Sequence, residues 1–418
     1  MEKPLSMGKL GALSMLKTLN IPKTYMAILP ILPILAQYSI LGGTLDLDVI
    51  AMLVVFGGFL LCKKTLRVKN AGIVITLLLY TCLVALGNIM WGRLFAAPSQ
   101  IIMRMGRYVI YLTLALIVAR DTVEYKTIMN ACRIVAYVSL VYVAMQAVAF
   151  YGAGITLPNK IGAGMGTKVS DVGRLSALFS EPADMCYSLT PFIVCSLFGP
   201  QYREKDSRLR DAVCITLAVL LTTSSQGSVC VISLWAVWCV LSAVKGKWNA
   251  RSIVAFLMAV VVLLILYNSG VLEYSLGRLE DGGESTAWQA RSGGYAALQL
   301  LSPIQKFLGA GYGNYFSENV YKLDTYGEMV NFSSISESLF TQGIIGSVLM
   351  LLLMIRVFAQ GKGFQRILVL VMLGLSVGGC PFTGKYLPLY FGLIMCNMDG
   401  ISKDKKGNEL IQQEGAGL

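Results

Sequence analysis

The chain has 418 residues, of which 56% are hydrophobic and 14% are charged, and its mean hydropathy is +0.66. This composition excludes a soluble domain with one core, because apolar runs of about 20 residues, long enough to cross a bilayer, recur along the chain. A transmembrane β-barrel would show short alternating segments instead. The net charge of +12 does not indicate nucleic-acid binding, since the basic residues lie between the hydrophobic runs.

The apolar runs predict an all-α polytopic membrane protein with about 12 transmembrane helices in a single domain, residues 1–418. Pro30 and Pro33 predict a kink in the first span. The predicted spans are residues 25–41, 49–62, 71–90, 101–119, 128–151, 185–198, 212–224, 228–244, 252–268, 339–358, 367–379 and 387–398.

Lys and Arg are concentrated in alternate connections between these spans, for example in Lys63–Lys69 and Arg203–Arg210. Cytoplasmic connections of membrane proteins are enriched in Lys and Arg, so both termini are predicted to be cytoplasmic. The two longest loops, residues 152–180 and 270–336, are then extracytoplasmic. Charge asymmetry therefore predicts an active face outside the cytoplasm.

The ten cysteines lie almost entirely within apolar spans, and none forms a Cys-x-x-Cys pair. They are predicted to be small apolar core residues rather than disulfide partners or metal ligands. The chain has no histidine. A general base with a near-neutral pKa would therefore have to be a carboxylate, unless the reaction needs no base.

Charged side chains at membrane depth are costly, so they are candidates for function. Arg104 and Arg107 share a helix face near the outer end of the fourth span. They could clamp a lipid-linked phosphate, whose oxygens match guanidinium forks, or extend to the headgroups. Arg133, near the inner end of the fifth span, is expected to extend to the headgroups.

The loop 152–180 ends in a group of charges at the start of the sixth span: Arg174, Glu181 and Asp184. Ser180 is expected to cap this helix and Pro182 to occupy its first turn. Glu181 could stabilise the helix dipole, or this group could contact phosphate or sugar.

In the loop 270–336, Arg291 precedes a predicted amphipathic helix, and Gly309–Gly313 follows as a predicted tight surface turn that contains Tyr312. The apolar face of that helix comprises Tyr295, Leu298, Leu301 and Ile304. The glycine cluster lacks the lysine of a phosphate-binding P-loop.

Glu337 lies where the chain re-enters the membrane, after Ser333, Ser334 and Ser336. A partly desolvated carboxylate at this position could act as a general base. It could equally be an acidic residue in the first turn of a helix capped by a serine. The sequence leaves both alternatives open.

Four segments occur in an order that resembles a known family: Arg174–Pro182, Leu220–Gly227, Arg291 with Phe307–Asn314, and Glu337 with Gly343–Gly346. They read Arg-Leu-Ser-Ala-Leu-Phe-Ser-Glu-Pro, Leu-Leu-Thr-Thr-Ser-Ser-Gln-Gly, Phe-Leu-Gly-Ala-Gly-Tyr-Gly-Asn and Gly-Ile-Ile-Gly. The ordered set is similar to the O-antigen polymerase and ligase superfamily, the Wzy-type polymerases and WaaL-type ligases.

The resemblance implies a GT-C-like glycosyltransferase of the bacterial inner membrane that uses undecaprenyl-diphosphate-linked glycan, without metal, cofactor or nucleotide sugar. Arg174 and Arg291 correspond to arginines of the two large external loops that matter for activity in the family. The ligases carry a His where this chain has Phe332, which favours a polymerase. Gln226 stands where the family often has an Arg, so no role is carried over there.

We therefore expect a polysaccharide polymerase whose partners are lipid-linked oligosaccharide, membrane lipids and a chain-length regulator protein, with no nucleic acid. The alternatives are an O-antigen ligase and a flippase or transporter of lipid-linked sugars. The predicted catalytic residues are Glu337, Arg291 and Arg174, with Arg104, Arg107, Glu181, Asp184 and Tyr312 as substrate contacts.

The predicted topology can be tested by labelling introduced cysteines from outside intact cells. Ser285→Cys, in the long loop, should react with an impermeant thiol reagent, and Ser207→Cys, in a basic connection, should not. The opposite labelling pattern would contradict the assignment of the active face.

Overall fold

The computed structural model describes residues 20–40, 45–62, 71–91, 98–160, 175–203, 207–244, 293–312, 332–379, 381–382 and 384–398, with isolated positions between 246 and 264. Arg174 and Arg291 lie outside these residues, as does most of the predicted span 252–268. The described residues form helices, together with one small hairpin that pairs β1 (Ser39–Ile40) with β2 (Leu45–Asp46). The predicted all-α class is confirmed for this part of the chain.

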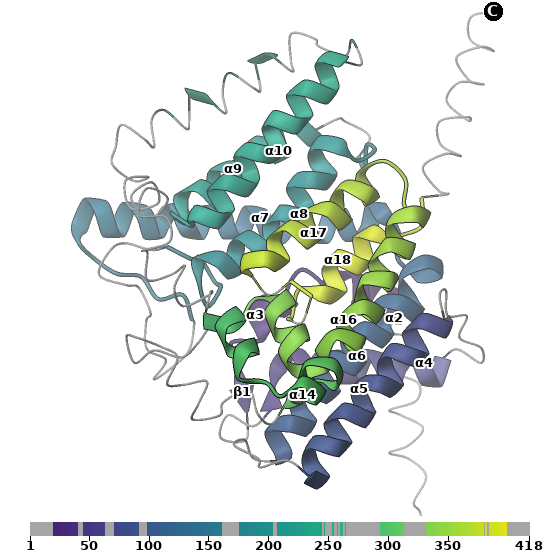
Figure 1. Cartoon of the computed structure of the whole chain (residues 1–418). Helices are drawn as coiled ribbons and strands as arrows, with labels where there is room; N and C mark the ends of the chain where they lie inside the picture. The colour runs from purple at the N-terminus through teal and green to yellow at the C-terminus, as the bar shows by residue number, and fades with distance from the viewer. Residues whose placement is uncertain are drawn as a thin grey trace, which may run out of the picture.

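Most predicted spans correspond to helices within a few residues at each end. These are α4 (Leu47–Cys62), α5 (Ala71–Trp91), α6 (Pro98–Thr122), α7 (Tyr125–Ala147) with its π-helical extension η1 (Val148–Gly152), α8 (Pro182–Phe198), α9 (Arg208–Leu221), α10 (Ser225–Val244), α16 (Ser334–Gln360) and α17 (Phe364–Gly378). Figure 1 shows α8 and α17 near the middle of the bundle, with α4 and α5 on one side and α9 and α10 on another.

Within the described part of the chain, four helices are long and apolar enough to cross a membrane: α5, α7 with η1, α10 and α16. Most of α5 is not covered by protein, since Leu79, Leu83 and Leu86 are 60%, 66% and 55% exposed. Large apolar side chains exposed along such a helix are stable only against lipid. The chain is therefore a helical membrane protein.

The first predicted span is not one helix. It consists of α2 (Ile21–Ile28) and α3 (Leu32–Leu35), and the chain then enters β1. Pro30 and Pro33 explain the interruption, because proline has no N–H to continue the helical hydrogen bonds. The sequence predicted a kink, whereas the structure has a break.

The last predicted span, residues 387–398, is also shorter than expected, because α18 covers only Leu387–Ile394. All of its residues are buried. At about 1.5 Å per residue, α18 is too short to cross a bilayer alone. It packs against α6, α8 and α17 as a core helix.

Helix α16 is broken near its start, because Gly343 has φ 66° and ψ −170°. The break lies against the backbone of Gly309 and Gly311, whose φ angles of 89° and 77° are also positive. A Cβ at Gly343 would overlap the backbone of Phe307 and Gly309. We call residues 309–311 together with the break in α16 the glycine clasp.

Hydrogen bonds hold the glycine clasp together. The amides of Ala310 and Gly311 donate to the carbonyls of Phe340 and Thr341 at 2.8 and 3.1 Å. Asn88 Nδ2, on α5, donates to the Ala310 carbonyl at 2.8 Å. The carbonyls of Phe340 and Thr341, beside the helix break, thereby have hydrogen-bond donors from outside the helix.

Two expectations for this region were wrong. Of the predicted surface turn Gly309–Gly313, the described residues 309–312 are packed, since Ala310 and Tyr312 are each only 6% exposed. The predicted amphipathic helix is interrupted: α-helical residues 293–296 continue into the 3-10 helix η3 (Ala297–Leu300), and α14 (Pro303–Leu308) follows after a break. Ser302 caps α14 through a capping box and Pro303 opens it, which separates the two pieces.

The glycine clasp predicts that a methyl group at Gly343 destabilises the fold. Gly343→Ala would place a non-glycine residue at φ 66° and ψ −170°, a region that essentially only glycine adopts, at a cost of about 1–3 kcal/mol, and would add overlap with the Gly309 backbone. The midpoint of thermal unfolding in detergent should therefore fall. Gly374→Ala in α17 is the matched control, because nothing lies within 4 Å of its added Cβ. Equal midpoints for the two variants would contradict this account of the clasp.

Candidate functional site

A polar cluster lies beside the glycine clasp, where α6 and α16 meet the segment that follows α14. Gln342 Nε2 donates to the Tyr312 hydroxyl at 2.9 Å. The Tyr108 hydroxyl lies beside the Gln342 side chain. The charges of Glu337 and Arg104 both act on the Tyr312 phenol. We call Arg104, Tyr108, Tyr312, Glu337 and Gln342 the Tyr312 cluster.

Three chain segments bring these side chains together. Arg104 and Tyr108 are four residues apart in α6, so they share a face of that helix. The glycine clasp holds Tyr312, which directly follows Gly311. Helix α16 carries Glu337 in its first turn and Gln342 at its break. Arg104, Tyr312 and Glu337 were predicted as site residues, and the structure brings all three together.

Glu337 is half-buried, and it is not the cap of α16. Ser333 and Ser336 form a capping box, and their hydroxyl groups satisfy each other's backbone amides. Glu337 lies in the first turn of α16, where the helix dipole interacts favourably with a carboxylate, and the capping itself is done by the serines.

Burial raises the pKa of the Tyr312 phenol well above its usual range, and the neighbouring Tyr108 and Glu337 raise this pKa further. The amide of Gln342 and the guanidinium of Arg104 lower it. The net direction is upward, so Tyr312 stays protonated at neutral pH and can donate a hydrogen bond. It is not a base.

The Tyr312 cluster contains an unpaired acceptor, because Gln342 Oε1 is buried with no hydrogen-bond partner among the described residues. An unsatisfied buried polar group costs about 1–3 kcal/mol of stability. Such groups in a native structure call for an explanation, and a role in function is a common one.

Arg107 does not point into the Tyr312 cluster. Its guanidinium pairs with Asp46 in β2 and with Asp48 in α4, the latter at 3.0 Å. Asp48 is fully buried and also accepts from the Tyr111 hydroxyl. Arg107 therefore ties the hairpin and α4 to α6, and the predicted joint phosphate clamp with Arg104 is not what the described residues form.

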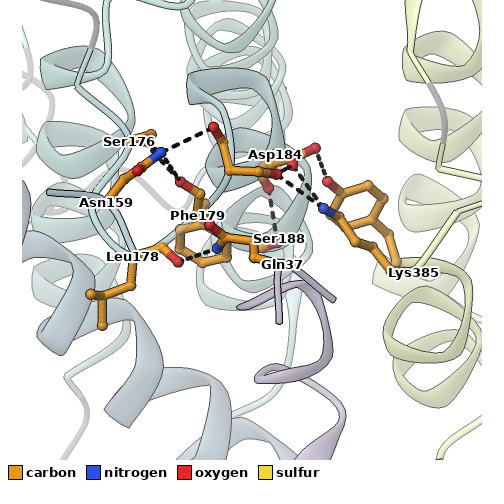
Figure 2. Close-up of polar contacts among 10 residues, drawn as sticks. Gln37, Asn159, Ser176, Leu178, Phe179, Asp184, Ser188 and Lys385 are labelled. Carbon is orange, nitrogen blue, oxygen red and sulfur yellow. Dashed lines mark hydrogen bonds and ion pairs between the residues drawn. The ribbon is translucent and has the colours of Figure 1, made fainter. Parts of the chain in front are cut away.

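A second charged group joins α8 to the segment just before α18. Lys385 Nζ donates to Asp184 Oδ2 at 2.8 Å and to Ser180 Oγ at 3.2 Å. The Tyr386 and Ser180 hydroxyls also donate to the Asp184 carboxylate. Figure 2 shows Lys385 reaching Asp184 across the gap between the two ribbons. We call these four residues the Asp184 lock.

The segment before α8 is held by amide side chains from three other places. Asn159 Nδ2 donates to the carbonyls of Phe179 and Ser180, each at 3.1 Å. Gln146 accepts from the Ala177 amide at 2.8 Å, and Gln37 donates to the Leu178 carbonyl. Figure 2 shows Gln37 and Asn159 against this segment. A chain fixed in this way holds the start of α8 in one position.

Ser180 does not cap α8, contrary to the sequence prediction. The capping position is Glu181, which makes no side-chain capping bond, and the Ser180 hydroxyl is used by Asp184. Glu181 is exposed, and no hydrogen bond or ion pair of its carboxylate is found among the described residues. Its carboxylate is thus available for a ligand, unlike that of Asp184.

The Asp184 lock and the Tyr312 cluster lie at the same end of the bundle. The Ser334 amide, at the start of α16, donates to the Gly379 carbonyl at 2.7 Å. Ser334 Oγ in turn accepts from the Phe382 amide at 3.0 Å, three residues before Lys385. The starts of α6, α8, α16 and α18 therefore meet at one end of the described bundle.

Arg133 lies elsewhere and differs from the prediction that it extends to headgroups. Its Nε atom is 3.3 Å from the fully buried carboxylate of Asp211 in α9. Tyr137 and Tyr202 also donate to this carboxylate. A buried charge requires partners of this kind, so Arg133 is a structural residue.

Sequence reasoning missed Tyr108, Gln342 and Lys385. Gln342 could have been singled out from the sequence, because it is a polar residue near the start of an apolar span. Lys385 could have been singled out as a positive charge that precedes the last predicted span on the side predicted to be outside. No cluster of His, Cys, Asp or Glu suited to a metal ion is found among the described residues.

Comparison with protein-family models and with curated proteins found no match for this chain. The resemblance to the polymerase and ligase superfamily accordingly rests on the sequence motifs, and it stays a prediction.

The Asp184 lock predicts a loss of stability when its carboxylate is removed. Asp184→Asn would leave the Lys385 ammonium, which is only 18% exposed, without its counter-charge, at a cost of about 1–3 kcal/mol. Glu181→Gln, three residues earlier and exposed, should change stability by less than about 0.5 kcal/mol. Thermal unfolding of both variants in detergent measures the difference. Part of the loss should be recovered in Asp184→Asn combined with Lys385→Met, and equal midpoints for the two single variants would contradict the lock.

Proposed function

We propose that this protein is a polysaccharide polymerase that transfers a growing glycan from undecaprenyl diphosphate to the terminal sugar of another lipid-linked repeat unit. The observation that carries the proposal is the meeting of Arg104, Tyr312 and Glu337 at one end of a membrane bundle. An arginine, a hydrogen-bond donor and a carboxylate are the groups that this transfer needs.

In the proposed reaction, the acceptor hydroxyl attacks the anomeric carbon of the donor glycan. The bond from that carbon to the diphosphate oxygen breaks, and the electron pair leaves with undecaprenyl diphosphate. The proton of the acceptor hydroxyl passes to Glu337. The leaving group is already anionic, so it needs electrostatic stabilisation more than protonation, and Arg104 supplies positive charge near Tyr312.

Arg174 and Arg291 complete the proposed site on the diphosphate. Both lie outside the described residues: Arg174 directly precedes the described segment that begins at Leu175, and Arg291 lies two residues before the one that begins at residue 293. Arg174 precedes the segment that is fixed by Asn159 and Gln146. A guanidinium can offer two parallel hydrogen bonds to phosphate oxygens.

Among the three candidate carboxylates, the geometry favours Glu337 as the base. Asp184 already accepts from Lys385, Ser180 and Tyr386, so its oxygens are occupied. Glu181 is exposed to solvent and is not part of the Tyr312 cluster. Glu337 is half-buried within that cluster, and its charge acts on the Tyr312 phenol.

A transporter of lipid-linked sugars is the second candidate, because broken helices form substrate sites in many transporters. The break at Gly343 in α16 is such a feature. However, the carbonyls of Phe340, Thr341 and Gln342 accept from Ala310, Gly311 and Tyr80, so they are not available to a substrate. The break at Gly343 is therefore explained by these hydrogen bonds within the protein rather than by a substrate site.

The proposal includes the predicted 12-span, GT-C-like topology in a bacterial inner membrane, with the active end facing outward. The alternation of basic connections supports this orientation, as does the basic end opposite the Tyr312 cluster. That opposite end carries Lys126, Arg133, Arg208 and Arg210, near the bridge between Glu124 and Asn397.

The test is chain extension in membranes that are given only lipid-diphosphate-linked repeat units. A polymerase lengthens the lipid-linked chains, whereas a flippase does not. Glu337→Gln keeps the size of the side chain but removes its charge, so the rate should fall by about 2–4 orders of magnitude at equal protein level. Glu337→Asp should retain weak activity.

Glu124→Gln is the matched control, because this exposed carboxylate lies at the opposite end of the bundle and accepts a hydrogen bond from Thr127 in the first turn of its own helix. It should extend chains at the normal rate. Full-length polymer from the Glu337→Gln variant in a polymerase-deleted strain would show that Glu337 is not the base.

A further inference from the structure

The short helix α14 lies deep beside the membrane-spanning helices, although the sequence places it in an external loop. The Tyr80 hydroxyl donates to the carbonyls of Leu308 and Gln342, both at 2.9 Å. Leu308 is the last residue of α14, and Tyr80 lies near the middle of α5. In Figure 1, α14 lies against α16, and α5 extends beyond it.

The depth can be estimated from the helix rise. Helix α5 has 21 residues, Ala71–Trp91, and matches a hydrocarbon core of about 30 Å at about 1.5 Å per residue. Tyr80 is 91 − 80 = 11 residues from the outer end of α5, which corresponds to about 16 Å. By the same rule, Gln342 is 342 − 334 = 8 residues, or about 12 Å, below the start of α16. Leu308 therefore lies well below the outer helix ends.

The exposed surface of α14 suits hydrocarbon rather than water. Ile304, Phe307 and Leu308 share one face at i, i+3 and i+4, and they are 70%, 57% and 46% exposed. Lys306 points to the opposite side, because it is two residues, about 200° of helical rotation, from Ile304. A helix with an apolar face and a Lys on the other side is typical of membrane interfaces.

This face continues the lipid-facing surfaces of the neighbouring helices. On α5, Leu79 and Leu83 are 60% and 66% exposed, and they flank Tyr80. On α16, Ile344 and Ile345 follow the break directly and are 42% and 40% exposed. Both helices are long and apolar enough to cross a membrane. Bilayer lipids that cover α5 and α16 would therefore cover α14 as well.

The backbone around α14 also meets the requirement for irregular chain in a membrane. Hydrocarbon cannot satisfy backbone polar groups, so such a segment must satisfy them within the protein. The carbonyls of Leu308 and Ala310 accept from Tyr80 and Asn88. The Gly309 amide donates to the Gln305 carbonyl at 2.7 Å, and the capping box of Ser302 closes the first turn.

We propose that residues 297–312 form a re-entrant segment that dips into the outer half of the bilayer, with Ile304, Phe307 and Leu308 against lipid hydrocarbon chains. The predicted external loop 270–336 is then divided by a membrane-embedded part. This inference concerns membrane contact and stands independently of the proposed reaction. It also places one wall of the Tyr312 cluster in contact with lipid.

A photoreactive benzophenone amino acid at chosen positions tests the proposal in native membranes. After irradiation, the protein is digested and its peptides are analysed by mass spectrometry for attached phospholipid. The substitutions Ile304→p-benzoylphenylalanine and Phe307→p-benzoylphenylalanine should give lipid adducts. The second one closely conserves the shape of the native side chain, which protects the test against misfolding.

Two further positions serve as the positive and the negative control for lipid crosslinking. The same residue at Leu83, on the lipid-facing surface of α5, should give lipid adducts in amounts similar to those at Ile304. At Lys306, on the opposite side of α14, lipid adducts should be a minor product. The proposal fails if Leu83 gives lipid adducts while Ile304 and Phe307 give no more than Lys306, or if both crosslink to another part of the protein.

Discussion

The end of the bundle that holds the Tyr312 cluster depends on one close approach of two backbones. Gly309 and Gly311 pack against the break at Gly343, and a Cβ at any of these three positions would overlap a neighbouring residue. Their positive φ angles are also ones that only glycine adopts without strain. This contact fixes the end of α14 against α16. It thereby sets the positions of Tyr312 and Gln342, which meet at 2.9 Å.

The remaining charges at this end divide into two kinds according to their partners. Asp184 and Arg107 form ion pairs that join separate elements, and hydroxyl groups also donate to the Asp184 carboxylate, so both residues organise the fold. The charges of Glu337 and Arg104 both act on the buried phenol of Tyr312, which follows the glycine clasp. A carboxylate and a guanidinium that act on one buried tyrosine form a polar cluster around it. This difference in partners, and not proximity to the membrane alone, is the reason for assigning Glu337 and Arg104 to the candidate site and Asp184 and Arg107 to structural roles.

Sequence patterns predicted what depends on local periodicity, and they failed where contacts are distant. Apolar runs located most helices to within a few residues, and the serine cap before Glu337 was predicted correctly. The partner of Asp184 could not be found in this way, since Lys385 is 201 residues away. The glycine cluster was misjudged as a surface turn, because its packing partner at Gly343 lies beyond a stretch of more than 30 residues. The effect of Pro30 and Pro33 in the first span was underestimated, since a kink was predicted but the helix ends there.

The burial of the Tyr312 cluster has an electrostatic consequence. Interactions between charges strengthen as the surroundings become less polar, and Tyr312 is only 6% exposed. In the proposed reaction, a diphosphate that approaches Arg104 there would be stabilised more than in bulk water, which favours the growth of negative charge on the leaving group. Exclusion of water from this site would also limit hydrolysis of the donor, and would thus favour transfer to sugar over transfer to water.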